Sequence, residues 1–285
     1  MNTRVRATLF ATASLSALMM AGCSSSAEET PSPSASAPAV DAPLETLTEG
    51  KLTIATGEPA YEPWVIGDAP ESGEGFEAAV AYAVAEELGF AAEDVVWVRS
   101  AFDAAIAPGA KDWDLNIQQF SVTEERAQAV DFSSPYYVTS QALVAVDGTP
   151  AAEASSIADL TGSTVGVTVG TTSYTVAAEA LGEDNLSVYN SVADVVGALN
   201  AGQIDAFVTD LPGAFYSAYV EVENGTIVGQ FEGTEGGDEF AFVLPKGSAL
   251  TTAVTAAVDA LREDGTLAAL ETEWLSEAAG VPVLQ

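Results

Sequence analysis

The chain has 285 residues, 48% of them hydrophobic, which is enough to bury a sizeable core in one large domain or two lobes. Its 8 basic and 42 acidic residues give a net charge of −34, so we expect no nucleic-acid partner and repulsion from anionic lipid. It has no histidine and one cysteine, which excludes Cys/His zinc sites, Ser-His-Asp or Cys-His catalysis and an intrachain disulfide. We expect no metal and no cofactor.

Residues 1–22 have the pattern of a secretory signal peptide. Two arginines precede an apolar run over 7–21, about 15 residues long and too short for a comfortable membrane span. The run ends at Met20-Ala21-Gly22-Cys23, which resembles a lipobox, although leucine is usual where Met20 stands. The resemblance implies a lipoprotein whose Cys23 carries a diacylglyceryl thioether and an acylated amine, with fatty acids such as palmitate. The alternative is an ordinary signal peptide with an incidental cysteine.

Residues 23–46 are rich in serine, proline and alanine and have no apolar periodicity. This composition predicts a disordered tether. Two or more acyl chains on Cys23 would hold the protein stably on a bilayer. We therefore expect the folded part to lie at the cell membrane, anchored by lipid on the extracytoplasmic face.

The first predicted strand, 51–56, leads into a loop that contains two prolines. In open α/β sheets, ligands bind outside the carboxyl ends of the strands. Tyr61 and Trp64 in this loop are therefore candidates for packing on a ligand side chain. The alternative is that both close the edge of the core.

The next segments alternate between helices and strands. Apolar side chains recur every four residues over 76–88, which predicts a helix with one apolar face, and Gly89 fits its C′ cap. A strand at 95–98, a helix at 102–106 and a strand at 114–117 follow. This βαβαβ order predicts a parallel sheet covered by helices.

After this third strand the chain turns over three residues. Ser121, with Glu124 three residues later, fits a capping box at the start of a helix, and Arg126 would lie in its first turns. The free N–H groups of a helix start attract an anion, and arginine pairs with both oxygens of a carboxylate. Arg126 is thus a candidate carboxylate ligand; the alternative is an ion pair with a surface acid.

The sequence S-V-T-E-E-R-x-x-x-V-D-F-S-x-P-Y-Y over 121–137 resembles the signature of family 3 extracellular solute-binding proteins, the polar amino-acid receptors of ABC importers. The resemblance covers roughly 50–276. It implies the α/β, two-lobed type II periplasmic-binding-protein fold, each lobe a mostly parallel sheet flanked by helices, with a ligand cleft between lobes. The first lobe would comprise 47–140 and 236–285, and the second 141–235.

The rest of the chain predicts a second set of strands and helices. Expected strands lie at 141–146, 164–169, 187–190, 206–210, 227–230 and 240–244, and expected helices at 155–160, 174–181, 191–201, 250–262 and 267–275. The glycine-rich link 233–237 is a plausible second hinge segment. The resemblance places 240–244 back in the first lobe.

Gly170-Thr171-Thr172 lies between a predicted strand and a predicted helix. The glycine permits a sharp turn, and threonine hydroxyls with N–H groups at a helix start can bind an anion. The resemblance makes this turn the second carboxylate-binding element. A plain N-cap is the alternative.

Asp210 ends a predicted strand just before Pro212, which suits the first turn of a helix. The position at a strand's carboxyl end is that of a ligand-binding group, and the family uses this aspartate to accept hydrogen bonds from the ligand's α-ammonium. Arg126, the threonine pair and Asp210 together would complement a zwitterion. A ligand that touches both lobes would drive hinge closure.

The chain departs from the family at Gln118-Gln119-Phe120, where small or hydroxylated residues are commoner. With Ser121, these positions would line the ligand, and the two amides suggest a smaller pocket or one that favours a polar side chain. Glu58 matches a family acid that approaches the ligand's side chain, which hints at a cationic or amide ligand.

We expect a monomer that delivers a polar amino acid to the permease subunits of an ABC importer. Two other functions fit parts of the sequence: a receptor that reports occupancy to a signalling protein, and a dehydratase-like enzyme on the same fold. The enzyme would need a carboxylate such as Glu58, or a tyrosine, as general acid or base, because histidine is absent.

Overall fold

The computed structural model describes residues 44–231, 237–275 and 281–284. The predictions for the signal peptide, Cys23 and the tether up to residue 43 lie outside these residues. Leu44 packs against the first hydrophobic core, and the N–H of Leu47 donates to Asp114 Oδ1 at 2.8 Å. Residues 44–46, which were expected in the tether, therefore belong to the folded part. Within the described residues, no helix is long and apolar enough to cross a membrane.

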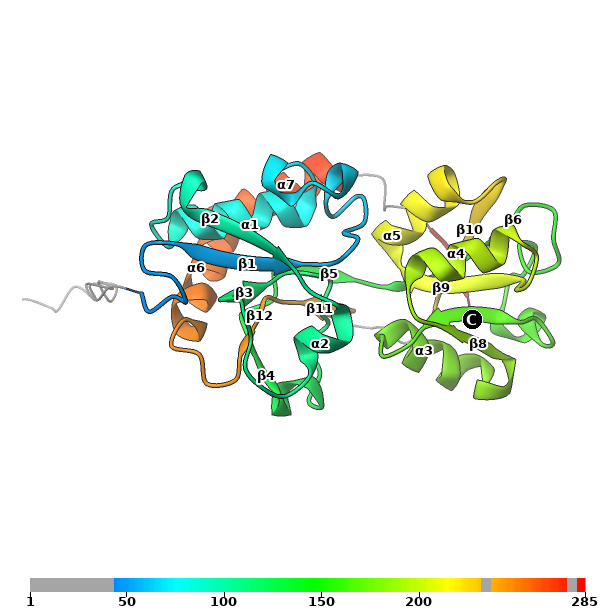
Figure 1. Cartoon of the computed structure of the whole chain (residues 1–285). Coiled ribbons are helices and arrows are strands. Elements are labelled where there is room, and N and C mark those ends of the chain that lie inside the picture. The colour runs from blue at the N-terminus through cyan, green and yellow to red at the C-terminus, as the bar shows by residue number, and fades with distance from the viewer. Residues whose placement is uncertain (1–43, 232–236, 276–280, 285) are drawn as a thin grey trace, which may run out of the picture. The chain divides into compact units, whose positions relative to one another are not determined.

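The first sheet has five strands in the order β2-β1-β3-β12-β4 (Figure 1). The parallel part follows the predicted βαβαβ order, and β12 then lies antiparallel to β3 and β4. The elements are β1 (Leu52–Thr56), α1 (Phe76–Glu87), β2 (Val95–Arg99), α2 (Phe102–Ile106), β3 (Leu115–Asn116), β4 (Val130–Phe132) and β12 (Val243–Pro245).

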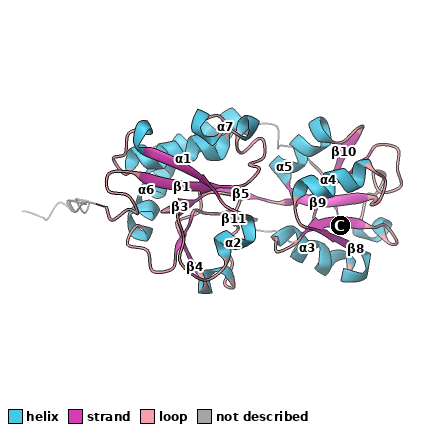
Figure 2. Ribbon diagram, in the orientation of Figure 1, coloured by secondary structure: helices cyan, strands magenta, loops and turns pink. Residues whose placement is uncertain are grey.

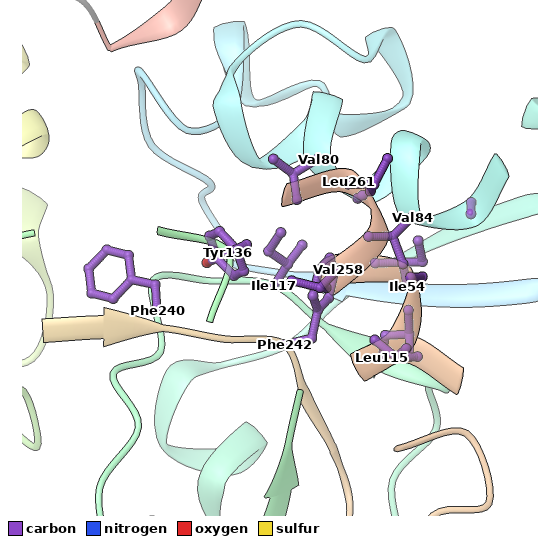
Figure 3. Packing of buried hydrophobic residues seen from close by; sticks show 14 of the residues in the cluster. Ile54, Val80, Val84, Leu115, Ile117, Tyr136, Phe240, Phe242, Val258 and Leu261 are labelled. Carbon is purple, nitrogen blue, oxygen red and sulfur yellow. The ribbon is translucent and has the colours of Figure 1, made fainter. Parts of the chain in front are cut away.

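One face of this sheet is covered by α1 together with α6 (Thr251–Glu263) and α7 (Thr266–Trp274). Figure 3 shows Val80 and Val84 of α1 packing with Val258 and Leu261 of α6. Helix α1 begins where Gly75 has φ 102°, and a Cβ there would lie 2.6 Å from the carbonyl oxygen of Trp64. Only glycine fits this close approach.

The second sheet has six strands in the order β13-β10-β6-β9-β7-β8. Figure 2 shows its strand β9 with α4 on one side and α3 on the other. Along β6, Leu143 and Ala145 face one hydrophobic core and Ala142 and Val144 face the other. Burial on both faces explains why this strand is a continuous apolar run. The elements are β6 (Gln141–Val146), β7 (Val165–Thr168), α3 (Thr172–Leu181), β8 (Leu186–Tyr189), α4 (Val192–Asn200), β9 (Ala206–Asp210), α5 (Leu211–Tyr216), β10 (Gly225–Phe231) and β13 (Val283–Leu284).

The predicted helix at Ser121 is wrong. Residues 121–125 are not helical, and only a short 3₁₀ turn forms at Arg126–Gln128. Val122 N–H pairs with the carbonyl of Glu239, and Ser121 forms a β-bridge with Phe240, so this backbone is committed to another strand. Thr123 Oγ1 accepts the N–H of Arg126 at 3.1 Å instead.

Two further expectations differ at the end of the chain. The predicted strand 240–244 is split into β11 (Asp238–Phe240), which pairs with β5 (Tyr137–Thr139), and β12 in the first sheet. Residues 281–284 were expected in the first lobe, but β13 pairs with β10 in the second sheet. The sequence of this short strand does not indicate which sheet it joins, because its partner lies some 50 residues earlier in the chain.

Candidate functional site

A cavity of about 220 Å³ lies at the carboxyl ends of strands from both sheets. Its walls come from the loop after β1, the turn after β3, the start of α3 and the end of β9. Nine of the eleven ligand-binding residues predicted from the sequence line it: Glu58, Tyr61, Gln118, Gln119, Ser121, Arg126, Thr171, Thr172 and Asp210.

Arg126 supplies the positive charge of this cavity. Its side chain is buried, and its two terminal nitrogens donate to the carbonyls of Ser121 at 2.8 Å and Gly170 at 2.9 Å. The guanidinium carbon lies 5.4 Å from the ring centroid of Phe102. Among the described residues no carboxylate lies within 4 Å of it, which removes the alternative of a surface ion pair. Burial lowers the pKa of Arg126, and the charges of Asp238 and Asp210 oppose this.

The two threonines of the Gly170-Thr171-Thr172 turn have different roles. Thr171 is the N-cap of α3: its hydroxyl accepts the N–H of Tyr174 at 3.2 Å and donates to the carbonyl of Thr168 at 2.7 Å. Thr172 Oγ1 lies 3.3 Å from Ser121 Oγ on the other lobe. The N-cap alternative thus describes the side chain of Thr171, whereas Thr172 presents its hydroxyl at the contact between lobes.

Asp210 also lines the cavity, at the last position of β9. Its Oδ1 accepts a hydrogen bond from Gln141 Nε2 at 2.8 Å. Burial and the negative charge of Asp238 together raise the pKa of Asp210 to about 7, against the opposing effects of Gln141 and Arg126. Asp210 therefore titrates near neutral pH in the absence of an added cation.

The loop after β1 is held by Arg99. Its guanidinium donates to the carbonyl of Gly57 at 2.7 Å and to Oδ1 of Asp68 at 2.6 Å, and Asp68 Oδ1 also accepts the N–H of Ala60. These contacts fix the backbone on both sides of Glu58 along the cavity. Tyr61 reaches Ser191 and the backbone of Ala193 on the second lobe, and burial raises its pKa.

Trp64 sits at the edge of the first core. It is 3% exposed and meets Phe76, Tyr137 and Phe240 edge to face, with centroids 5.6–6.1 Å apart. It does not line the main cavity but borders a neighbouring one of about 50 Å³, which Tyr61 and Asp210 also line. Its surroundings are those of a core residue with one edge toward the site.

Gln118 and Gln119 have different environments. Gln119 has φ 49°, and its backbone N–H donates to Oε1 of Glu77 at 2.7 Å while its side-chain amide donates to Oε2. Glu77 is fully buried in the first turn of α1 and also accepts from the hydroxyl of Tyr136. Gln118 Oε1 is buried on the cavity wall with no hydrogen-bond partner among the described residues, so an acceptor remains for a ligand.

The comparisons with known proteins agree with this geometry. A profile of the bacterial extracellular solute-binding proteins, family 3, matches residues 52–277. The chain belongs to this family. It is 29% identical over 240 residues to an L-arginine-binding protein of Pseudomonas aeruginosa, an alignment that covers 77% of this chain and 86% of that protein. The chain spans 64% and 86% of the first two curated relatives that it matches.

Two solved structures resemble this family 3 protein closely. An ancestral arginine-binding protein bound to arginine has a TM-score of 0.67 and 29% identity, covering 79% of this chain and 98% of that one. An ancestral amino acid-binding protein described as a precursor of cyclohexadienyl dehydratase has a TM-score of 0.64 and 27% identity, covering 79% and 95%. The two-lobed type II periplasmic-binding-protein fold expected from the sequence is confirmed.

Phe120 does not reach the cavity of this family 3 protein. Its side chain is fully buried and stacks on Phe102 with centroids 4.8 Å apart. Phe102, which sequence reasoning did not select, lines the cavity under Arg126. Phe102 is the first residue of the helix that follows the end of β2, and Tyr61 was selected because it also follows a strand end. The same argument could therefore have selected Phe102 from the sequence.

Gln141 and Asp238 were also missed. Gln141 is fully buried at the first position of β6, and Asp238 is the first residue of β11. Both contact the polar network around Asp210 and Thr172. Neither position follows the end of a predicted strand, so strand-end reasoning does not find them. In the part of the chain that the structure describes, no group of three or more His, Cys, Asp or Glu side chains is placed to hold a metal ion.

Proposed function

We propose that this family 3 solute-binding protein is the lipid-anchored receptor of an amino-acid ABC importer and binds a polar amino acid as a zwitterion. The observation that carries the proposal is the pair of opposite charges on one cavity: Arg126, with no carboxylate within 4 Å among the described residues, and Asp210. A guanidinium without a carboxylate partner suits the ligand's carboxylate, and an ionised Asp210 suits its ammonium.

Both lobes contribute residues to this cavity. Arg126 and Ser121 belong to the segments around the first sheet, and Gly170, Thr172 and Asp210 to the second. A zwitterion that contacts Arg126, Thr172 and Asp210 would stabilise the closed arrangement more than an open one. Closure would then report occupancy to the permease subunits, the expected partners of a monomeric receptor.

The relatives support the amino-acid class. The similar Pseudomonas protein is named for binding L-arginine, and the ancestral structure contains arginine. In this chain Glu58, Tyr61, Gln118 and Gln119 line the remainder of the cavity and would contact the ligand's side chain. These groups favour a polar side chain over an apolar one.

Calorimetric titration of the full chain, purified in a mild detergent, against the twenty amino acids and cystine tests this proposal. We expect binding by one chemical class, and loss of at least about thirtyfold in affinity for Asp210→Asn, because truncating one partner of a buried charge pair costs 2–5 kcal/mol or more. Asp184→Asn removes an exposed charge from the same lobe and should bind normally. No binding of any amino acid, or equal affinity in Asp210→Asn, would refute the zwitterion assignment.

The lipid anchor is tested separately. Growth with a labelled fatty acid should label the wild-type protein and place it in the membrane fraction, because acyl chains hold a protein on a bilayer. Cys23→Ser should be unlabelled and released. A labelled Cys23→Ser protein, or an unlabelled wild type, would contradict the anchor at this cysteine.

Uptake and turnover measurements separate the rival functions. A sensing receptor would bind the amino acid equally well, but deletion of its gene would not reduce uptake of that amino acid. A dehydratase would consume a prephenate-like acid, and its turnover would depend on Glu58. Recovery of the bound amino acid unchanged, together with loss of its uptake when the gene is deleted, would exclude both.

A further inference from the structure

Asp238 makes contacts that no part of the zwitterion scheme uses. It is the first residue of β11, whose neighbours Glu239 and Phe240 pair with Val122 and Ser121 next to the first sheet. Its Oδ2 accepts the hydroxyl of Thr172 at 2.6 Å. A carboxylate held against the first lobe therefore contacts a cavity residue of the second.

Gln141 links Asp238 to Asp210. Its Nε2 donates to Asp238 Oδ2 at 2.6 Å and to Asp210 Oδ1 at 2.8 Å, one hydrogen for each carboxylate. Its Oε1 accepts the hydroxyl of Ser173 at 2.7 Å, which fixes the amide with its nitrogen toward the two acids. Gln141 is fully buried, so this orientation is held away from solvent.

We propose that Asp238 is a second acidic group of the amine end of the cavity, so that an entering ammonium group meets the combined field of two carboxylates joined by Gln141. The inference rests on the proposed function, because it takes Asp210 as the acceptor of the ligand's amine. Asp238 is a positioning residue: it acts on the ligand through Asp210 and Gln141.

The charges around Asp210 support this role. Asp238 on β11 and Arg126 are the charged groups that act on its titration, and Asp238 has the larger effect. The phenol groups of Tyr136 and Tyr137 lie on the side of β5, and the charge of Asp210 contributes to raising the pKa of each. Before any ligand binds, one positive charge thus faces two negative charges. A bound cationic amine would balance them.

This arrangement selects the chemistry of the ligand. An α-ammonium group brings a full charge to the paired acids, whereas the hydroxyl of a 2-hydroxy acid brings only one hydrogen-bond donor. The cavity should therefore reject the 2-hydroxy acid analogue of its amino acid. It should also bind the amino acid less well when Asp210 is protonated, because the ammonium then meets one carboxylate.

The test compares Asp238→Asn, Asp238→Glu and the control Asp184→Asn in the full chain. Affinity is measured by calorimetry at pH 8 and pH 5.5 for whichever of the twenty amino acids or cystine binds most tightly, and for its 2-hydroxy acid analogue. The titration of Asp210 is followed by carboxyl-carbon NMR without ligand, with Asp210→Asn to assign the signal.

We expect Asp238→Asn to bind roughly tenfold more weakly at pH 8 and to lose this deficit at pH 5.5, because removal of the second charge lets Asp210 stay ionised in acid. The pKa of Asp210 should fall in Asp238→Asn and stay near its wild-type value in Asp238→Glu. Discrimination against the 2-hydroxy acid should shrink in Asp238→Asn alone.

Equal weakening of Asp238→Asn at both pH values, with no change in the titration of Asp210, would overturn the inference and leave a structural role. That result is compatible with a receptor that still depends on Asp210. Failure of every amino acid to bind would overturn the proposed function itself, and the inference with it.

Discussion

Arg126 and Asp210 face one cavity with opposite charges, but their surroundings differ in kind. Arg126 is held by two backbone carbonyls and an aromatic ring, and no carboxylate of the described residues lies within 4 Å. Asp210 shares an amide with a second acid and has a pKa raised to about 7. The charge at the arginine end is therefore fixed, whereas the charge at the aspartate end depends on pH.

The largest effect should follow from removing the fixed charge. Arg126→Met keeps an unbranched apolar stem but leaves the ligand's carboxylate without a partner, so affinity should fall by at least about thirtyfold at every pH, corresponding to 2 kcal/mol or more. Arg126→Lys keeps the charge but not the paired donors, and should lose less. Calorimetry of both variants checks this. Near-normal binding by Arg126→Met would mean that the carboxylate binds elsewhere.

The pH dependence of the wild type should come from the aspartate end. An ammonium ligand binds the ionised form, so binding expels a proton from Asp210, whose pKa is about 7 without ligand. Affinity should level off near pH 8 and fall by up to about tenfold per unit as pH decreases from 7. Titrations in buffers of different ionisation enthalpy would detect the released proton. A flat profile between pH 5 and 8 would contradict the ionised-acceptor model of the amine end.

Glu77, beneath Gln119, provides a buried acid outside the cavity for comparison. Burial raises its pKa to about 7 in the folded chain, above its ordinary value near 4.5. Its stabilising contribution is therefore complete below pH 4.5 and lost as pH rises through 7. Glu77→Gln mimics the protonated form, so its stability relative to wild type should improve by roughly 1–3 kcal/mol between pH 5 and pH 8. Denaturant unfolding at both pH values measures this, and an unchanged difference would place the titration elsewhere.

The smallest expected effect separates the two adjacent threonines. Thr171→Ala removes the N-cap of α3 and should lower the unfolding free energy by about 0.5–2 kcal/mol. Ligand affinity should change little, because Thr172 presents the hydroxyl toward the other lobe. Thr172→Val should show the reverse pattern. Thermal unfolding and calorimetry of both variants measure these effects. Loss of binding in Thr171→Ala alone would show that the roles of the two threonines are assigned wrongly.

Much of the fold could be predicted because its signals are local. The four-residue repeat of apolar side chains and Gly89 located α1, and the continuous apolar run located β6 with the observed ends. Asp210 was selected because it ends a strand, and this end does border the cavity. Periodicity and strand ends depend on a few neighbouring residues, so they can be recognised without knowledge of the rest of the chain.

The failures are long-range. Ser121 and Glu124 fit a capping box, but β11, more than a hundred residues later, takes the backbone of this segment and no helix forms. The same strand places Asp238 in contact with Thr172 of the cavity. Both features were missed for the same reason. The residues that pair with an irregular segment are far away in the chain, so the segment's own sequence does not reveal them.

The last strand has a mechanical consequence. Helix α7 and Leu275 pack in the first core, and Val283–Leu284 complete the second sheet, so the chain crosses between lobes at this point as well as before β6 and before β11. Any opening motion must therefore leave three connections between the lobes intact, which restricts the relative rotation of the lobes more than two connections would.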